Sequence, residues 1–127
     1  MSDAGPGHRA VAVAGTGRVR VTIRGRLVAD SRRSVLVHES GLPVRYYLPP
    51  QDVDHSAFVP TPTRTYCPFK GEAVYWAYRG AGEGVPEVPD VMWSYPDPLA
   101  PLAAIAGHLS FYGHLADVVA EEFPGAG

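Results

Sequence analysis

The chain has 127 residues, of which 46% are hydrophobic and 19% charged, with a formal net charge of -2 at pH 7. This length suits one domain with a single hydrophobic core, and the composition excludes a disordered, acidic or basic tail. The near-neutral charge gives no electrostatic case for a nucleic-acid partner. No apolar run reaches the length of a membrane span, so we expect no membrane and a cytoplasmic location. The oligomeric state is not indicated.

The predicted domain covers residues 18–122, because periodic patterns begin and end there. Residues 1–17 are small, rich in glycine and without periodicity, so a flexible leader is predicted. Residues 123–127 are predicted to form a flexible tail.

Short strands with alternating apolar and polar residues make up most of the predicted domain. Val19, Val21 and Ile23 alternate with arginines, which is typical of a strand with one buried face. Gly25 marks the turn to a return strand, and prolines and glycines end the later segments. Strands are also predicted at 34–40, 44–48, 72–78, 91–95 and 108–112, with a helical turn at 52–58, an extended run at 60–67, a loop at 80–90, and either a strand or a helical turn at 116–122.

The only cysteine and the only lysine of the chain occur together in TYCPFKGEA, as Cys67 and Lys70. An ammonium beside a thiol favours the nucleophilic thiolate, and Pro68 and Gly71 favour a turn that brings both side chains to one cleft. The alternatives are a buried Cys67 acting as a small hydrophobe and a Lys70 reaching solvent over an aromatic ring. A single cysteine excludes a disulfide and a paired-cysteine zinc site, so we predict no metal and no cofactor.

Glu39 ends the apolar strand at 34–40, and it is predicted to act with Lys70 as acid and base if chemistry occurs. The preceding His38 alternates with it across the strand, so we expect the two on different walls. Arg45 follows closely, and with Lys70 it is predicted to bind an anionic or carbonyl group of a ligand.

Aromatic residues are numerous for so small a domain. Tyr and Trp combine a ring with a polar end that needs a partner, so several of them around a cleft suit a planar or amphipathic small molecule. The alternative is that alternating aromatic residues simply form the core. The ligand-binding residues predicted with Arg45 are Tyr47, Tyr75, Trp93 and Tyr95.

Three segments carry a resemblance to a known family: VADSRRSVLVHESGLPVRYYLPPQDV, TRTYCPFKGEAVYW and WSYPDPLAPLAAIAGHLSFY. In this order and spacing the chain resembles the uncharacterised bacterial domain-of-unknown-function family four-two-seven, over about residues 18–122. The resemblance implies a small all-β domain similar to the β-tent group, with two antiparallel sheets leaning together around a cleft. Relatives in that wider group often hold zinc in paired cysteine motifs, and this chain lacks the second cysteine. The resemblance implies no particular reaction.

The leading hypothesis is therefore an all-β domain that binds a small polar or aromatic molecule in an aromatic-lined cleft carrying Lys70, Glu39 and Arg45. One alternative is an auxiliary enzyme of small-metabolite metabolism, with Glu39 and Lys70 as acid and base and Cys67 as the candidate nucleophile. The other is a protein-interaction domain without a small-molecule site, whose aromatic residues would form a flat, exposed patch. The sequence does not decide whether the protein is an enzyme.

Overall fold

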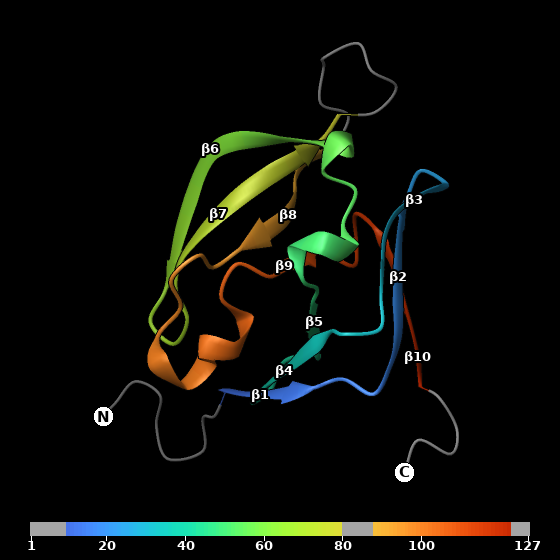
Figure 1. Ribbon diagram of the computed structural model, residues 1–127. Helices are drawn as coiled ribbons and strands as arrows, with labels where there is room; N and C mark the ends of the chain where they lie inside the picture. Colours follow the sequence, from blue (N-terminus) through green and yellow to red (C-terminus); the bar gives the residue numbers. More distant parts are fainter. Residues whose placement is uncertain (1–9, 80–87, 123–127) are drawn as a thin grey trace.

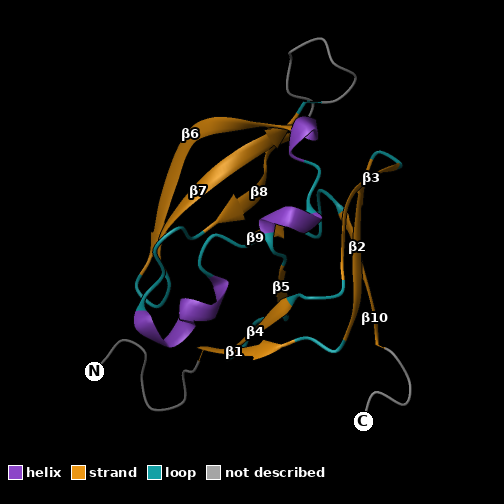
Figure 2. Cartoon of the chain, viewed as in Figure 1, coloured by secondary structure: helices purple, strands orange, loops and turns teal. Residues whose placement is uncertain are grey.

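The computed structural model describes residues 10–79 and 88–122, and antiparallel strands dominate these two ranges (Figure 1). The helical segments are short 3-10 turns, as the colouring in Figure 2 shows. The predicted all-β class is confirmed. The 3-10 turns are η1 (Pro50–Asp52), η2 (His55–Ala57) and η3 (Ala100–Ile105), of which the first two occupy the region of the predicted helical turn.

The described strands form three antiparallel sheets, where the sequence predicts two. Sheet A has the order β1 (Ala10–Ala14), β4 (Val35–Glu39), β5 (Arg45–Tyr47). Sheet B has the order β10 (Asp117–Glu122), β2 (Gly17–Ile23), β3 (Arg26–Ser31). Sheet C has the order β6 (Phe58–Cys67), β7 (Gly71–Tyr78), β8 (Val88–Ser94), β9 (Leu109–Phe111).

A corner at Gly15 separates sheets A and B and explains the extra sheet. The chain leaves β1, turns at Gly15 and continues as β2, while β3 and β4 make the matching turn beside it (Figure 1). The Gly15 amide donates to the Ser34 carbonyl at 2.8 Å. A Cβ on Gly15 would lie 2.5 Å from the Ser34 hydroxyl oxygen, so no other residue fits without a shift.

Strand β1 corrects the predicted leader, which was placed over residues 1–17. Residues 10–14 pair with the full length of β4, from Ala10 opposite Glu39 to Ala14 opposite Val35. The small alternating residues of AVAVA gave too weak a pattern, and the strand is defined by a partner distant in sequence. Residues 1–9, the predicted tail at 123–127 and most of the predicted loop at 80–90 lie outside the described residues, but the end of that loop, from Val88, belongs to β8.

The β2–β3 hairpin forms as the sequence predicts. Val19, Val21 and Ile23 are buried, and the intervening side chains point outward. The two-residue turn has φ of 52° at Arg24 and 82° at Gly25, which is the type I′ geometry that matches the twist of the strands.

Strand β6 lies at the edge of sheet C, which explains how it contains Pro60 and Pro62. Proline lacks an amide donor, so strands tolerate it only where no neighbour needs that donor.

The sequence left two options open for the segment 116–122, a strand or a helical turn. The structure shows that it is largely the strand β10, which pairs with β2.

Two buried clusters fill the spaces between the sheets. The larger one joins the inner face of sheet B to the β8 and β9 end of sheet C. The smaller one lies between sheets A and C and is covered by η3. Leu48, directly after β5, and Leu109 exchange two backbone hydrogen bonds of 2.8 Å, which tie sheet A to sheet C between the clusters.

Candidate functional site

The three candidate catalytic side chains, Glu39, Cys67 and Lys70, lie together in the structure. Lys70 Nζ donates to Glu39 Oε1 at 2.5 Å and lies 3.9 Å from Cys67 Sγ. Cys67 and Lys70 share the turn between β6 and β7, where the Lys70 amide donates to the Cys67 carbonyl at 3.1 Å. Gly71 closes this turn with a φ of 109°, a conformation that other residues rarely adopt. The conformation of this turn therefore directs the Lys70 side chain toward Glu39 at the end of β4.

The Glu39–Lys70 ion pair is largely removed from water, since each side chain is 11% exposed. An ammonium at this distance from a carboxylate is already compensated, so Lys70 presents no unbalanced positive charge to a ligand. Glu39 and His38 both line a shallow depression at this strand end. The expectation that they lie on different walls is wrong, because β4 ends at Glu39 and the chain turns away there.

The four aromatic residues predicted to bind a ligand come together in the smaller buried cluster and are between 1% and 8% exposed. We call Tyr47, Tyr75, Trp93 and Tyr95 the aromatic cluster. Trp93 Nε1 donates to the Tyr47 hydroxyl at 3.2 Å, and these two rings meet edge to face with centroids 6.3 Å apart. The Tyr75 hydroxyl and the Thr65 hydroxyl form a hydrogen bond of 2.8 Å. The rings thus pack on one another and do not form an exposed aromatic patch.

The buried phenols stay protonated well beyond neutral pH. Burial raises the pKa of Tyr47 to about 12, although the Trp93 hydrogen bond and the Arg45 charge act in the opposite direction. Burial also raises the pKa of Tyr95 and, to about 12, that of Tyr112, which follows β9. The phenol groups are therefore neutral donors and acceptors at physiological pH and not candidate bases.

Arg45, on β5, lies beside the aromatic cluster but is positioned differently from Lys70. Its guanidinium carbon lies 5.4 Å from the centroid of the Trp93 ring and 5.8 Å from that of Tyr112. These distances are within the range of a cation–π interaction. The two rings themselves are tilted by 40° to each other, with centroids 4.3 Å apart. Among residues 10–79 and 88–122, no carboxylate forms an ion pair with Arg45.

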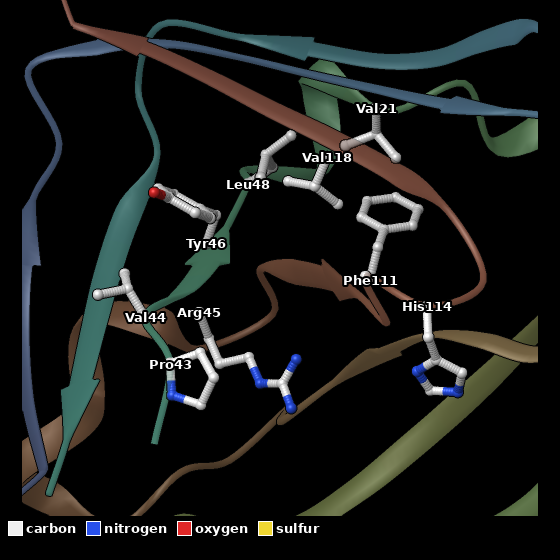
Figure 3. A pocket seen from close by; sticks show the side chains of 10 residues that line it. Val21, Pro43, Val44, Arg45, Tyr46, Leu48, Phe111, His114 and Val118 are labelled. Atoms are coloured by element: carbon white, nitrogen blue, oxygen red, sulfur yellow. The ribbon is translucent and has the colours of Figure 1, made fainter. Parts of the chain in front are cut away.

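A pocket of about 290 Å³ opens beside Arg45, at the place where all three sheets meet. In Figure 3, Phe111, Val118 and Val21 lie at one end of this pocket, and the guanidinium of Arg45 and the imidazole of His114 lie at the other. We call it the Arg45 pocket. Its lining residues are Val21 from β2; Pro43, Val44, Arg45, Tyr46 and Leu48 from β5 and its flanks; and Phe111, Gly113, His114 and Val118 from β9, β10 and their connection.

Most residues of the Arg45 pocket were not singled out by the sequence. Arg45 alone belongs to the predicted site, and His114 looked like one scattered histidine without a partner. The sequence predicts Val21 on the buried face of its strand. On β10 the adjacent Val118 and Val119 must point to opposite sides, so one of them faces inward. The pocket combines segments more than sixty residues apart, so no local pattern indicates it.

Within the described residues, no group of three or more His, Cys, Asp and Glu side chains is arranged to hold a metal ion. None of the helices in the same part of the chain has the length and apolar character needed to cross a bilayer.

Comparison with known proteins assigns the chain to a family but matches it to no curated protein. A search of curated proteins found no match. The family model described as Domain of unknown function (DUF427) matches residues 12–122, which includes sheets A, B and C almost completely. The chain therefore belongs to the DUF427 family, the family that the three sequence segments resemble.

Proposed function

We propose that this domain binds a small organic molecule in the Arg45 pocket, with a polar group of the ligand at Arg45 and an apolar body against Phe111 and Val118. The observation that carries the proposal is the environment of the Arg45 side chain. Arg45 is half-buried, its guanidinium lies over two aromatic rings, and it lacks a carboxylate partner among the described residues. A guanidinium has five N–H donors, so an acceptor group of a ligand would complete its surroundings.

The shape and lining of the pocket support the same proposal. A volume of about 290 Å³ lies at the lower end of the range for ligand sites, which suits a molecule of about one ring. Val21, Leu48 and Phe111 are buried residues that form the apolar part of the lining. A few polar groups on an otherwise apolar wall are typical of sites that orient a small ligand.

Blocking the pocket tests the proposal with a matched control. Val118→Trp places a large side chain in the pocket, while Val119→Trp makes the same change on the opposite face of β10. Single-ring compounds that bear a carboxylate, an amide or an alcohol serve as probes, and NMR chemical shifts report which residues they contact. We expect probe-induced shifts at residues 43–48 and 111–118 in the wild type and in Val119→Trp, and their loss in Val118→Trp. Shifts that persist in both variants would contradict the proposal.

A second candidate function, an enzyme of small-metabolite metabolism, is favoured by one observation. Lys70 lies within 2.5 Å of Glu39 and 3.9 Å of Cys67, so an acid, a cation and a nucleophilic sulfur share one place. An ammonium near sulfur promotes its reaction as a thiolate.

Alkylation of Cys67 tests this candidate directly, because it is the only thiol of the chain. The rate of its modification by iodoacetamide is followed by mass spectrometry in the wild type, in Lys70→Arg and in Lys70→Met. The enzyme candidate predicts the fastest reaction with a cation at position 70 and a several-fold slower one in Lys70→Met. Equal rates in all three proteins would leave Cys67 as a half-buried packing residue.

A further inference from the structure

We infer that the ligand of the Arg45 pocket is a monocarboxylate with a compact apolar body, an inference that rests on the proposed function and narrows it. The proposal above admits a carbonyl, an alcohol or an anion at Arg45. The arginines of this chain, the orientation of the Arg45 guanidinium and the charges around it together select a single carboxylate.

The other arginines provide the first step. Four of them, all in or beside sheet B, have a carboxylate partner, and their side chains are between 31% and 62% exposed. These pairs are Arg18 with Asp30 at 2.7 Å, Arg20 with Glu121 at 3.3 Å, Arg26 with Asp54 at 3.1 Å, and Arg33 with Asp52 at 2.9 Å. Arg45 is half-buried and has none among the described residues. Arg18 and Arg20 are half-buried like Arg45, and each is compensated by a carboxylate. A charge that is partly removed from water needs such compensation, so the position of Arg45 favours an external anion.

The orientation of Arg45 provides the second step. Contact with the Trp93 and Tyr112 rings restrains the guanidinium, and Arg45 lines the pocket (Figure 3). A restrained planar guanidinium is suited to two parallel hydrogen bonds with a carboxylate. A neutral amide or alcohol would accept fewer hydrogen bonds and would leave the positive charge uncompensated.

The surrounding charges limit the ligand to one negative charge. Lys70, the only lysine of the chain, is already compensated by Glu39, so it adds no positive charge for a ligand. Among the described residues that line the pocket, Arg45 is the one with a permanent positive charge. A phosphate dianion would need more positive charge than these residues supply.

The apolar end of the pocket defines the rest of the molecule. Val21, Leu48, Phe111 and Val118 offer no hydrogen-bonding side chain to a ligand. A ring or a branched alkyl group fills such a space, and a second polar substituent there would lose its hydration without a partner. Benzoate and cyclohexanecarboxylate are therefore suitable probes, and benzamide and cyclohexanecarboxamide are their neutral counterparts of nearly equal shape.

Titration of the full-length protein with these four compounds, followed by the NMR shifts of pocket residues, tests the inference. We expect each carboxylate to bind the wild type about tenfold more tightly than its amide, since hydrogen bonds to charged groups contribute more than neutral ones. Arg45→Gln should abolish this preference and Arg45→Lys should reduce it, because lysine keeps the charge but lacks the planar fork. Arg20→Gln removes the same charge from the surface of sheet B and should leave the preference unchanged.

The outcomes separate this inference from the proposed function. If carboxylates and amides shift the pocket residues at equal concentrations, or if Arg45→Gln keeps the preference, the carboxylate inference is overturned and the binding proposal stands. If none of the four compounds shifts any pocket residue at millimolar concentration, both are overturned. Circular dichroism of each variant confirms that the comparison is made between folded proteins.

Discussion

Lys70 and Arg45 both lie beside the aromatic cluster, yet their surroundings differ in one respect. Lys70 is paired with Glu39 in a largely buried contact, whereas Arg45 lies over two aromatic rings, lines an open pocket and has no carboxylate partner among the described residues. Both residues looked equivalent as predicted ligand cations. The comparison shows that the type of side chain is a weaker guide to binding than whether the protein already compensates its charge.

The aromatic residues divide in the same way. Tyr47 and Trp93 are buried and hydrogen-bonded to each other, so their primary role is to hold sheets A and C together. Tyr112 is half-buried, and the Arg45 guanidinium lies over the rings of Tyr112 and Trp93. On this view the aromatic cluster is the buried support of the site, and the Arg45 pocket beside it binds the ligand. Four predictions test this division, from the largest expected effect to the smallest.

Tyr47→Ala should cause the largest loss of stability. It removes a ring that is 1% exposed and also the acceptor of the Trp93 Nε1 hydrogen bond. We expect the free energy of unfolding to fall by about 4 kcal/mol, as for other truncations of large aromatic side chains in a core. Chemical denaturation provides the measurement. Tyr66→Ala is the matched control, because Tyr66 is 70% exposed and its truncation should be nearly neutral. Similar losses in both variants would mean that the cluster is not a core.

Lys70→Met should be the next most destabilising change, since it leaves the Glu39 carboxylate without its ammonium partner in a largely buried position. We expect a loss of about 3 kcal/mol in the free energy of unfolding. Adding Glu39→Gln in the same chain should recover part of this loss, because the unpaired charge is then removed. A variant that keeps its stability but loses ligand binding would instead place Lys70 in the binding site.

Alkaline pH should weaken the fold through Tyr47. The pKa of this phenol is about 12 in the folded protein and its ordinary value is 10.0, so folding favours the protonated form. This contribution is therefore complete below pH 10 and is lost as the pH rises through 12. At about pH 11 the loss should be about 1 kcal/mol. Tyr47→Phe lacks this titration, so its stability should fall less between pH 9 and pH 11 than that of the wild type. Parallel curves would contradict the shift.

Arg45→Gln should have the smallest effect on stability and the largest on binding. The guanidinium gives up only its contacts with the Trp93 and Tyr112 rings, which are worth about 1 kcal/mol. Its loss should nevertheless remove most of the affinity for a carboxylate. Thermal unfolding measures the first effect and titration with benzoate the second. A loss of stability comparable to that of Lys70→Met would show that Arg45 serves the fold.

The elements that the sequence predicted correctly are those with a strong local cause. The period of two at Val19, Val21 and Ile23 reflects a sheet with one buried face, and Gly25 supplies the positive φ that a tight hairpin needs. Strand β1 was missed because a run of alanine and valine has little pattern of its own. Its strand character depends on β4, a partner distant in the chain.

The candidate site, like the fold, was predictable only where its cause is local in the sequence. The turn at Gly71 is local, and it explains how sequence alone could place Cys67 and Lys70 together. That Lys70 would meet Glu39 was only one of several possible pairings, since the two residues are thirty-one positions apart. The Arg45 pocket needs the corner at Gly15 and the return of β10 along β2, and both are tertiary features. A pocket of this kind follows from the assembly of three sheets and has no sequence pattern.

A crystal structure of the protein with benzoate bound is the most direct test of the claim that the aromatic cluster supports the site and the Arg45 pocket binds the ligand. We predict the carboxylate on the guanidinium edge of Arg45, with the ring against Phe111 and Val118 and with the Glu39–Lys70 pair intact. Benzoate bound at Lys70 with that pair broken, or bound within an opened aromatic cluster, would contradict the account.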